Sequence, residues 1–532
     1  MSVDYIDKKA IRQQESEEIK TKCARRPKIK NAILRTYTRD DLAVQEVEVE
    51  VCLVSQIPSF QIVGLPEKAV KESRERVRAA ILNSGFTFPI KKVLVNLTPA
   101  DLPKHGGSFD LPIALAILMA SDQIPYREAM AQAIWVGELR LNGNVAGHQL
   151  LGFVVQAYRH KKTIVLPSTM GLPEALRGVS LYQVENLRQA ADLFVSDGRK
   201  AFSDPRIIKD REDLRRVDFS MVTGRVWEKV ACIIAAAGGH HLLFQGPPGV
   251  GKTLLAQCFS GILPDLSQDE MLEVALIYSW LGESRLSHLR PLRSPHHHIT
   301  PAGLLGGGSP LMPGEVSLSH QGVLFLDEIT EYAKGLLDQL REALVSREVN
   351  ISRVNKKMTL KTKFQLLVAM NPCPCGFYGD DDKCMCGHLE VKKHQRSIST
   401  PFLDRLDMQI LFDQDEEKGG RELAKTSGEM YDKYADLNTS KAIKRAVIEI
   451  RKRQIARQGV LNCDLSWQGC QVLVEAARAK DKGFAALEKS MGLQGRKWQK
   501  TMTVARTIGD CQGVSVMNAS HLRLAHGYTG QT

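Results

Sequence analysis

The chain has 532 residues, enough for roughly three to four domains. Apolar residues make up 43% and charged residues 25%, which is typical of a soluble globular protein. No apolar run reaches the roughly 18 residues of a membrane helix, and the N-terminus lacks a signal-peptide core, so we expect a cytoplasmic protein without a membrane partner. Its eleven cysteines are then expected to be thiols or metal ligands. The formal charge of +12 favours polyanionic partners.

Five segments follow one another along the chain. Residues 1–32 are polar and end in the basic cluster KTKCARRPKIK, which is either a solvated tail or a contact for nucleic acid. Residues 33–196 alternate strand-like and helical runs and are predicted to form an α/β domain. Residues 197–216 resemble a linker, residues 217–413 form a second α/β region, and residues 414–532 are almost wholly helical in pattern.

The second α/β region contains a phosphate-binding loop in the stretch FQGPPGVGKTLLAQ. Its central eight residues match G-x-x-x-x-G-K-[ST] between a short apolar run and an amphipathic helix, which is the context that the motif requires. Backbone N–H groups at such a helix start surround phosphate oxygens. We expect Lys252 to reach the β- and γ-phosphates of ATP and the Thr253 hydroxyl to ligate Mg²⁺. The residues predicted to contact the nucleotide are Gly246, Pro247, Pro248, Gly249, Val250, Gly251, Lys252, Thr253 and Leu254.

Four further motifs predict hydrolysis rather than binding alone. The apolar strand VLFL delivers Asp327, expected to hold Mg²⁺ through water, and Glu328, expected to polarise the attacking water. A second apolar strand ends at Asn371, a polar group suited to orienting that water. PFLDRLDM contains Arg405, interpreted as an arginine finger for a neighbouring subunit's γ-phosphate. LQGRKWQK places Arg496 near the start of a helix that is expected to close over the nucleotide.

The order of these motifs resembles that of AAA+ ATPases of the magnesium-chelatase-like group. Longer stretches, among them VNLTPADLPKHGGSFDLPIALAIL, RSPHHHIT, PGEVSLSHQGVLFLDE and AMNPCPCG, are similar to the ComM/YifB family over residues 33 to about 515. The resemblance implies a bacterial, hexameric DNA motor that promotes branch migration during natural transformation, with recombination proteins as further partners. One departure is Arg225, where the family tends to have glutamine near the adenine pocket.

Three loops of the ATPase region are candidates for partner contacts. REVNISRVNKKMTLKTKFQ is predicted to form a hairpin with Lys356 and Lys357 at its tip, either a pore element that tracks DNA phosphates or merely solvated charge. TPAGLLGGGSPLMPGE is expected to be a mobile loop for gating or backbone contact. In RSPHHHIT, three adjacent histidines do not share one strand face, which favours a structural or pore-lining role over a metal site.

A cysteine cluster follows the Asn371 strand in NPCPCGFYGDDDKCMCGH. Cys373, Cys375, Cys384 and Cys386 form two close pairs that are able to fold back into a tetrahedral thiolate site for structural Zn²⁺. The alternative is a loop packed by reduced cysteines.

The N-terminal domain contains PKHGGSFDL, which resembles the nucleophile segment of Lon-type proteases with Ser108 at the serine position. The position of the catalytic lysine falls at about Leu151, so a Lon-like fold without its dyad is expected. Lys71, Arg74 and Arg78 share one helix face, which is either solvated or a DNA contact.

Together these patterns and resemblances imply an α/β protein with a Lon-protease-like N-terminal domain, an AAA+ P-loop core and a helical C-terminal lid. Its expected function is an ATP- and Mg²⁺-dependent hexameric translocase on branched DNA. A chelatase-like motor that remodels a protein partner or drives metal insertion is the main alternative. A nucleotide-switched scaffold without turnover is disfavoured by the presence of Glu328, Asn371 and Arg405.

Overall fold

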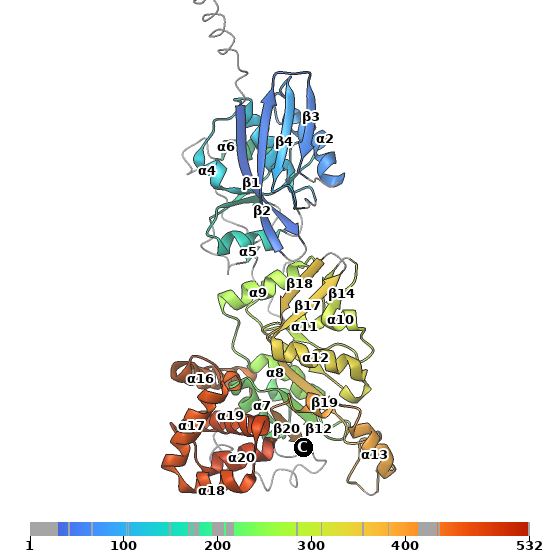
Figure 1. Ribbon diagram of the computed structural model, residues 1–532, viewed down its shortest axis with the longest axis vertical. Helices are drawn as coiled ribbons and strands as arrows, with labels where there is room; N and C mark the ends of the chain where they lie inside the picture. The colour runs from blue at the N-terminus through green and yellow to red at the C-terminus, as the bar shows by residue number, and fades with distance from the viewer. Residues whose placement is uncertain are drawn as a thin grey trace, which may run out of the picture. The chain divides into compact units, whose positions relative to one another are not determined.

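A computed structural model divides the chain into two compact units, residues Met1–Lys209 and Asp210–Thr532 (Figure 1). Each unit has its own sheet and its own hydrophobic core. Among the residues described below, no helix is both long enough and apolar enough to cross a bilayer. The structure describes residues 30–40, 43–64, 68–102, 104, 106–147, 150–168, 172–173, 180–193, 207–208, 217–283, 286–309, 311–353, 356–380, 382–412, 434 and 437–529.

A seven-stranded mixed sheet, in the order β10-β8-β5-β1-β2-β4-β3, forms the centre of the N-terminal unit. β1 and β2 pair antiparallel along their full lengths, from Lys30 opposite Leu53 to Asp40 opposite Ala43. This pairing starts the domain at Lys30 rather than at residue 33 as expected, so the last three residues of the predicted basic extension belong to the sheet. The strands are β1 (Lys30–Asp40), β2 (Ala43–Val54), β3 (Ser59–Val63), β4 (Lys92–Thr98), β5 (Ile134–Trp135), β8 (Ile164–Pro167) and β10 (Leu181–Val184).

One wholly buried helix, α3 (Asp110–Ala120), packs against β1 and β2 and supplies much of this unit's core. After its first residue, Asp110, the sequence DLPIALAILMA is apolar all round, which is the pattern of a helix with no solvent face. The other helices are α2 (Lys68–Asn83), α4 (Glu128–Gln132), α5 (Leu151–Arg159) and α6 (Leu187–Asp192). Two small ribbons pair β6 (Glu138–Leu139) with β7 (Val145–Ala146), and β9 (Leu172–Pro173) with β11 (Ile207–Ile208).

The C-terminal unit is built on a five-stranded parallel sheet in the order β13-β16-β19-β12-β20. The three central strands are almost entirely buried, as expected when helices cover both faces of a parallel sheet. The carboxyl ends of all five strands lie along the same edge. The strands are β12 (Leu242–Gln245), β13 (Leu292–Arg293), β16 (Val323–Leu326), β19 (Gln365–Met370) and β20 (Met408–Leu411).

Helices surround this sheet, and helices make up the regular structure of the described residues 437–529, which confirms the predicted fold class of a mixed α/β core followed by a helical region (Figure 1). The helices that precede the sheet strands or lie between them along the chain are α7 (Val226–Gly238), α8 (Lys252–Ile262), α9 (Gln268–Ser279), α10 (Pro301–Leu305), α11 (Glu315–Leu318), α12 (Lys334–Ser346), α13 (His388–Gln395) and α14 (Thr400–Leu403). The C-terminal helices are α16 (Ser440–Gln458), α17 (Trp467–Lys480), α18 (Lys482–Met491), α19 (Gly495–Gln512) and α20 (Ala519–Thr529).

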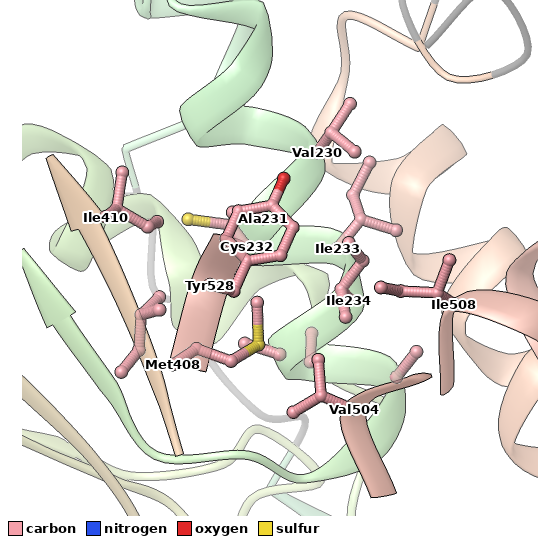
Figure 2. Close-up of a cluster of buried hydrophobic side chains, with 14 of the residues drawn as sticks. Val230, Ala231, Cys232, Ile233, Ile234, Met408, Ile410, Val504, Ile508 and Tyr528 are labelled. Atoms are coloured by element: carbon pink, nitrogen blue, oxygen red, sulfur yellow. The ribbon is translucent and has the colours of Figure 1, made fainter. Parts of the chain in front are cut away.

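A single hydrophobic core joins the C-terminal helices to the sheet (Figure 2). Ile233 of α7 and Ile508 of α19 are each at most 1% exposed, and Tyr528 of α20 lies beside Cys232 of α7. Met408 of β20 belongs to the same cluster. The C-terminal helices are therefore packed onto the parallel sheet through α7.

Two insertions interrupt the parallel sheet. β17 (Glu348–Arg353) and β18 (Lys356–Lys361) pair antiparallel, which confirms the predicted hairpin. The glycine-rich segment expected to be a mobile loop instead contains α10 and a two-stranded ribbon, β14 (Gly306–Gly307) with β15 (Met312–Pro313). The Thr300 side chain caps α10 by accepting a hydrogen bond from the Gly303 N–H. A threonine at this position is a local signal for a helix start, but the many glycines led us to expect a loop.

Candidate nucleotide site and four-cysteine loop

The phosphate loop connects β12 to α8, in the strand–loop–helix context that the motif predicted. Gly249 and Gly251 have φ angles of +80° and +94°, a conformation that glycine adopts without strain. At Gly246 a side chain would not fit, because an added Cβ would lie 2.5 Å from Cβ of Phe412. The loop therefore needs glycine both for its turn and for its approach to the strand next to β12.

Lys252 is the first residue of α8 and its side chain is only 8% exposed. Its ammonium group donates hydrogen bonds to the carbonyl oxygens of Gly246 (2.6 Å) and Pro247 (2.7 Å) and to Oδ1 of Asn371 (3.1 Å). Burial lowers the pKa of Lys252 to about 8, against the opposing effect of nearby carboxylates. The cation is thus held at the loop, in contact with the polar residue at the end of β19.

Thr253 and Asp327 form a candidate Mg²⁺ site. The Thr253 hydroxyl donates a 2.8 Å hydrogen bond to Oδ2 of Asp327, which follows β16 directly. Adjacent oxygen ligands of an octahedral Mg²⁺ lie about 3.0 Å apart, since each Mg–O distance is about 2.1 Å. The two oxygen atoms are therefore spaced as two neighbouring ligands of one magnesium ion would be.

Glu328 and Asn371 lie at the carboxyl ends of adjacent strands, because β16 pairs in parallel with β19. Glu328 has a φ of +50° and its N–H donates to Oδ1 of Asp327, so its backbone turns away from the strand. Its side chain is 58% exposed. The carboxylate is accordingly accessible to water next to the candidate Mg²⁺ site.

The three adjacent histidines lie in a turn, so the expectation that strand geometry keeps them apart was wrong. One ring nitrogen from each of His296, His297 and His298 lies within 4.8 Å of the other two. Nδ1 of His297 is 3.8 Å from Oε2 of Glu328, and the Tyr332 ring packs edge-on against His297. Sequence reasoning missed this proximity, which follows from the pairing of β13 with β16.

Arg405 and Arg496 lie on the opposite edge of the sheet from the phosphate loop of their own chain. Both line a cavity of about 300 Å³ together with His241, which precedes β12, and Asp407, which precedes β20. The placement of Arg405 away from its own loop agrees with a finger that acts on a neighbour. Arg496 lies in the first turn of α19, whose packing carries it to the amino ends of the strands, so a contact of this residue with nucleotide would also be with that of a neighbouring chain.

This cavity is rich in cations. Nε of Arg405 is buried and has no hydrogen-bond partner among the described residues, which is costly unless another molecule supplies an acceptor. Asp464 pairs with Arg347 and with Lys363, so part of the charge is compensated internally. The charged lining residues are Arg290, Arg347, Lys363, Arg405, Arg451 and Arg496 against Glu270, Asp407 and Asp464.

Arg225, the departure near the expected adenine pocket, precedes α7 with a φ of +51°. Its guanidinium carbon lies 5.7 Å from the centre of the Phe412 ring, and its Nη1 lies 3.4 Å from Oε1 of Glu228. Since Phe412 also contacts Gly246, Arg225 lies close to the start of the phosphate loop.

The four predicted cysteines converge. All four sulfur atoms lie within 4.8 Å of one another, and none of them forms a disulfide. Measured Sγ–Sγ distances are 3.3 Å for Cys373 to Cys375, 3.9 Å for Cys373 to Cys384 and 3.7 Å for Cys375 to Cys384. A tetrahedral zinc site with Zn–S bonds of about 2.3 Å places its sulfurs about 3.8 Å apart. The donor set and its spacing fit one zinc ion.

The remaining candidates are only partly described. Lys356 and Lys357 begin β18 and pair with Arg353 and Ser352, but their side chains, like that of Lys71, lie outside the described atoms. Arg74 and Arg78 are engaged locally: Nη1 of Arg74 donates to the carbonyl of Phe60, and Arg78 lies over the Phe88 ring. At the Lon-type lysine position, Leu151 is 1% exposed at the start of α5, so this position supplies no base for Ser108.

Comparison with known protein families matches three parts of the chain. The model for magnesium chelatase, subunit ChlI, matches residues 218–419. Models for subunit ChlI of Mg-chelatase and for the ChlI C-terminal region match residues 49–170 and 437–529.

Individual relatives cover almost the whole chain. A protein named YifB from Escherichia coli K12 is 36% identical over 503 residues, which is 92% of this chain and 96% of the relative. Competence protein ComM from Haemophilus influenzae is 36% identical over 510 residues, with the same two coverages. The matched span includes the phosphate loop, the acidic residues after β16 and the four-cysteine loop. The chain therefore belongs to the ComM/YifB family of magnesium-chelatase-like AAA+ ATPases.

Proposed function

We propose that this protein is a hexameric ATPase that moves on DNA and promotes branch migration while incoming DNA is integrated. The observation that carries the hydrolytic part is the meeting of Lys252, Thr253, Asp327, Glu328 and Asn371 at one edge of a parallel sheet. Ligands commonly bind at this edge of open α/β sheets, outside the carboxyl ends of the strands.

Each of these residues has a distinct role in the proposed reaction. Backbone N–H groups of the phosphate loop and the Lys252 ammonium bind the β- and γ-phosphates, and Thr253 and Asp327 hold Mg²⁺. When bound, Mg²⁺ neutralises charge that develops on the phosphate oxygens. Glu328 accepts a hydrogen bond from the attacking water and polarises it, while Asn371 orients the same water.

The proposal of a ring of chains is supported by the cavity at the amino ends of the strands. Arg405 and Arg496 lie away from their own phosphate loop, and the cavity holds more cations than carboxylates. In a closed ring, that edge of one chain faces the nucleotide of the next, so the buried and unpartnered Nε of Arg405 gains a phosphate or carboxylate acceptor. The site of hydrolysis is then completed between two chains.

The DNA part of the proposal rests on the hairpin β17–β18 and on the relative named competence protein ComM. Lys356 and Lys357 stand at the start of the returning strand, next to the hairpin's turn. Cations at a hairpin tip suit contact with phosphates irrespective of base sequence. The net charge of +12 agrees with a polyanionic partner. We further propose that the protein acts in the cytoplasm together with recombination proteins.

The same proposal assigns one structural zinc ion to Cys373, Cys375, Cys384 and Cys386. Four thiolates fill a tetrahedral shell and leave no position for substrate, so the metal has no direct part in hydrolysis. The observed sulfur spacing and the absence of disulfides among these residues support this assignment.

The decisive experiment is a branch-migration assay on a fluorescently labelled synthetic four-way junction. The purified full-length chain is expected to convert the junction into two duplexes with ATP and Mg²⁺, and to leave it intact with no nucleotide or with Glu328→Gln. DNA is expected to stimulate ATP hydrolysis by the wild-type protein.

A magnesium-chelatase-like motor that acts on a protein or a metal-insertion reaction predicts a different result. ATP would be hydrolysed at a rate indifferent to single-stranded, duplex and branched DNA, and the junction would persist. That outcome would refute the DNA part of the proposal while leaving the ATPase assignment intact.

A further inference from the structure

The four-cysteine loop is the segment between β19 and α13, and both of its ends lie at the candidate nucleotide site. It leaves the sheet at Asn371, passes through the cysteines and enters α13. In the last turn of α13, Nε2 of His394 lies 3.0 Å from the carbonyl oxygen of Asn371, and the Gln395 amide donates to the carbonyl oxygen of Pro372 at 3.4 Å. The loop therefore closes on the backbone of the residue that contacts Lys252.

A second contact links the loop to the phosphate loop. Gly376, with a φ of +86°, packs so closely on Pro248 that an added Cβ would lie 2.5 Å from the proline Cδ. Pro248 lies within the predicted nucleotide-binding loop. Together with the bond from Lys252 to Asn371, this contact means that the cysteine loop contacts the nucleotide site at two separate points.

Beyond Gly376, the described residues of the loop have no apolar interior of their own. Of the described residues between Phe377 and Glu390, none is buried, and the apolar side chains of Met385 and Leu389 are 96% and 81% exposed. A segment of this size without a core generally needs a crosslink or a metal to hold one shape. The converging sulfurs are the feature able to supply it.

We propose that the four-cysteine loop is a metal-dependent clamp on the nucleotide site. With Zn²⁺ bound to the four thiolates, the loop holds Pro248 and the backbone of Asn371 at fixed positions; without the metal, both contacts loosen. Zinc thereby controls ATP affinity through Pro248 and turnover through Asn371. This inference rests on the proposed ATPase activity and zinc site, and adds that the two are energetically coupled.

The first test compares metal content with nucleotide binding in the full-length chain. Cys384→Ser and Cys386→Ser remove distal ligands, whereas Cys52→Ser, in the other unit, is the matched control. We expect about one zinc per chain, measured by mass spectrometry, in the wild type and the control, and well under half of that in the two ligand variants. Displacement of supporting residues around a metal commonly costs 10- to 100-fold, so we expect losses of about that size in kcat, with weaker binding of a fluorescent ATP analogue.

The second test alters the contact without altering the metal ligands. Gly376→Ala introduces the clash with Pro248, while Gly379→Ala is the control, because its φ of +95° is equally unfavourable for alanine but an added Cβ meets nothing within 4 Å. We expect Gly376→Ala to retain its zinc and to bind the ATP analogue at least tenfold more weakly. Gly379→Ala is expected to stay within about twofold of the wild type in both measurements.

Three outcomes would overturn the clamp. The first is a wild-type chain that binds no zinc even after refolding with zinc alone. The second is loss of zinc in the ligand variants with unchanged nucleotide affinity and unchanged kcat. The third is equal behaviour of the Gly376 and Gly379 variants. A wild-type chain that holds zinc and binds nucleotide but hydrolyses no ATP would instead refute the proposed function, because the binding comparison still tests the clamp.

Discussion

Nucleotide binding is expected to weaken steeply in alkaline solution because of the environment of Lys252. Burial lowers the pKa of its ammonium group to about 8 in the free protein, and only the charged form attracts the phosphates. Bound phosphates favour the charged form, so the pKa rises in the complex. Between the two pKa values the fall in apparent affinity therefore approaches tenfold for each pH unit above about 8, which amounts to about 50-fold from pH 8 to pH 10.

The assay is a titration of the full-length chain with a fluorescent ATP analogue and excess Mg²⁺ from pH 7 to pH 10. Calorimetry in two buffers of different ionisation enthalpy should also detect uptake of about one proton on binding near pH 9. Lys252→Arg is the control, because a guanidinium stays charged over this range, so its affinity should lack the slope even if it is weaker overall. A wild-type dissociation constant that stays level up to pH 9.5 would refute this account of Lys252.

Other predictions concern hydrolysis and DNA. Glu328→Gln should bind ATP normally and lose turnover, as measured by phosphate release; turnover near the wild-type rate would exclude Glu328 as the group that polarises water. Arg405→Ala should lower kcat by about 10³-fold or more at nearly unchanged ATP affinity. Mixing it with Lys252→Ala chains should restore activity at mixed interfaces, and a failure to do so would contradict action between chains. Replacing Lys356 and Lys357 with alanine should weaken DNA binding and make its salt dependence shallower by about 0.7 to 0.9 per engaged lysine, with basal ATPase retained; unaltered DNA stimulation would exclude the hairpin tip.

The features that could be predicted from the sequence depend on neighbouring residues. The strand before Asp327 was expected at VLFL and occurs at Val323–Leu326, because a short apolar run ended by two carboxylates has few other stable arrangements. The strand–loop–helix context of the phosphate-loop motif and the hairpin of β17 and β18 were predicted correctly for the same reason: glycine spacing and β-propensity act locally.

The features that could not be predicted depend on packing between distant segments. Arg496 was assigned correctly to the start of a helix, but the position of α19 depends on contacts with α7 that no local pattern encodes. The histidines were judged as strand residues, whereas they occupy a turn beside Glu328. The close approach of Gly376 to Pro248 joins residues 128 positions apart, and a glycine in a cysteine-rich loop gives no indication of its partner.

The path of the chain offers a physical reason for DNA to influence hydrolysis. From Glu328 the backbone runs through α12 into the hairpin, and the hairpin leads into β19, which Asn371 follows directly. The hairpin is anchored at its base, because Nζ of Lys361 donates to Glu273 of α9 at 2.7 Å and His320 contacts the same carboxylate at 3.1 Å. These partners, His320 foremost, lower the pKa of Glu273 to about 2, so the anchor stays charged at neutral pH. On the proposed function, force that DNA exerts on the hairpin tip would reach Glu328 and Asn371 along these short, paired strands, so loss of the tip lysines should abolish DNA stimulation while sparing the basal reaction.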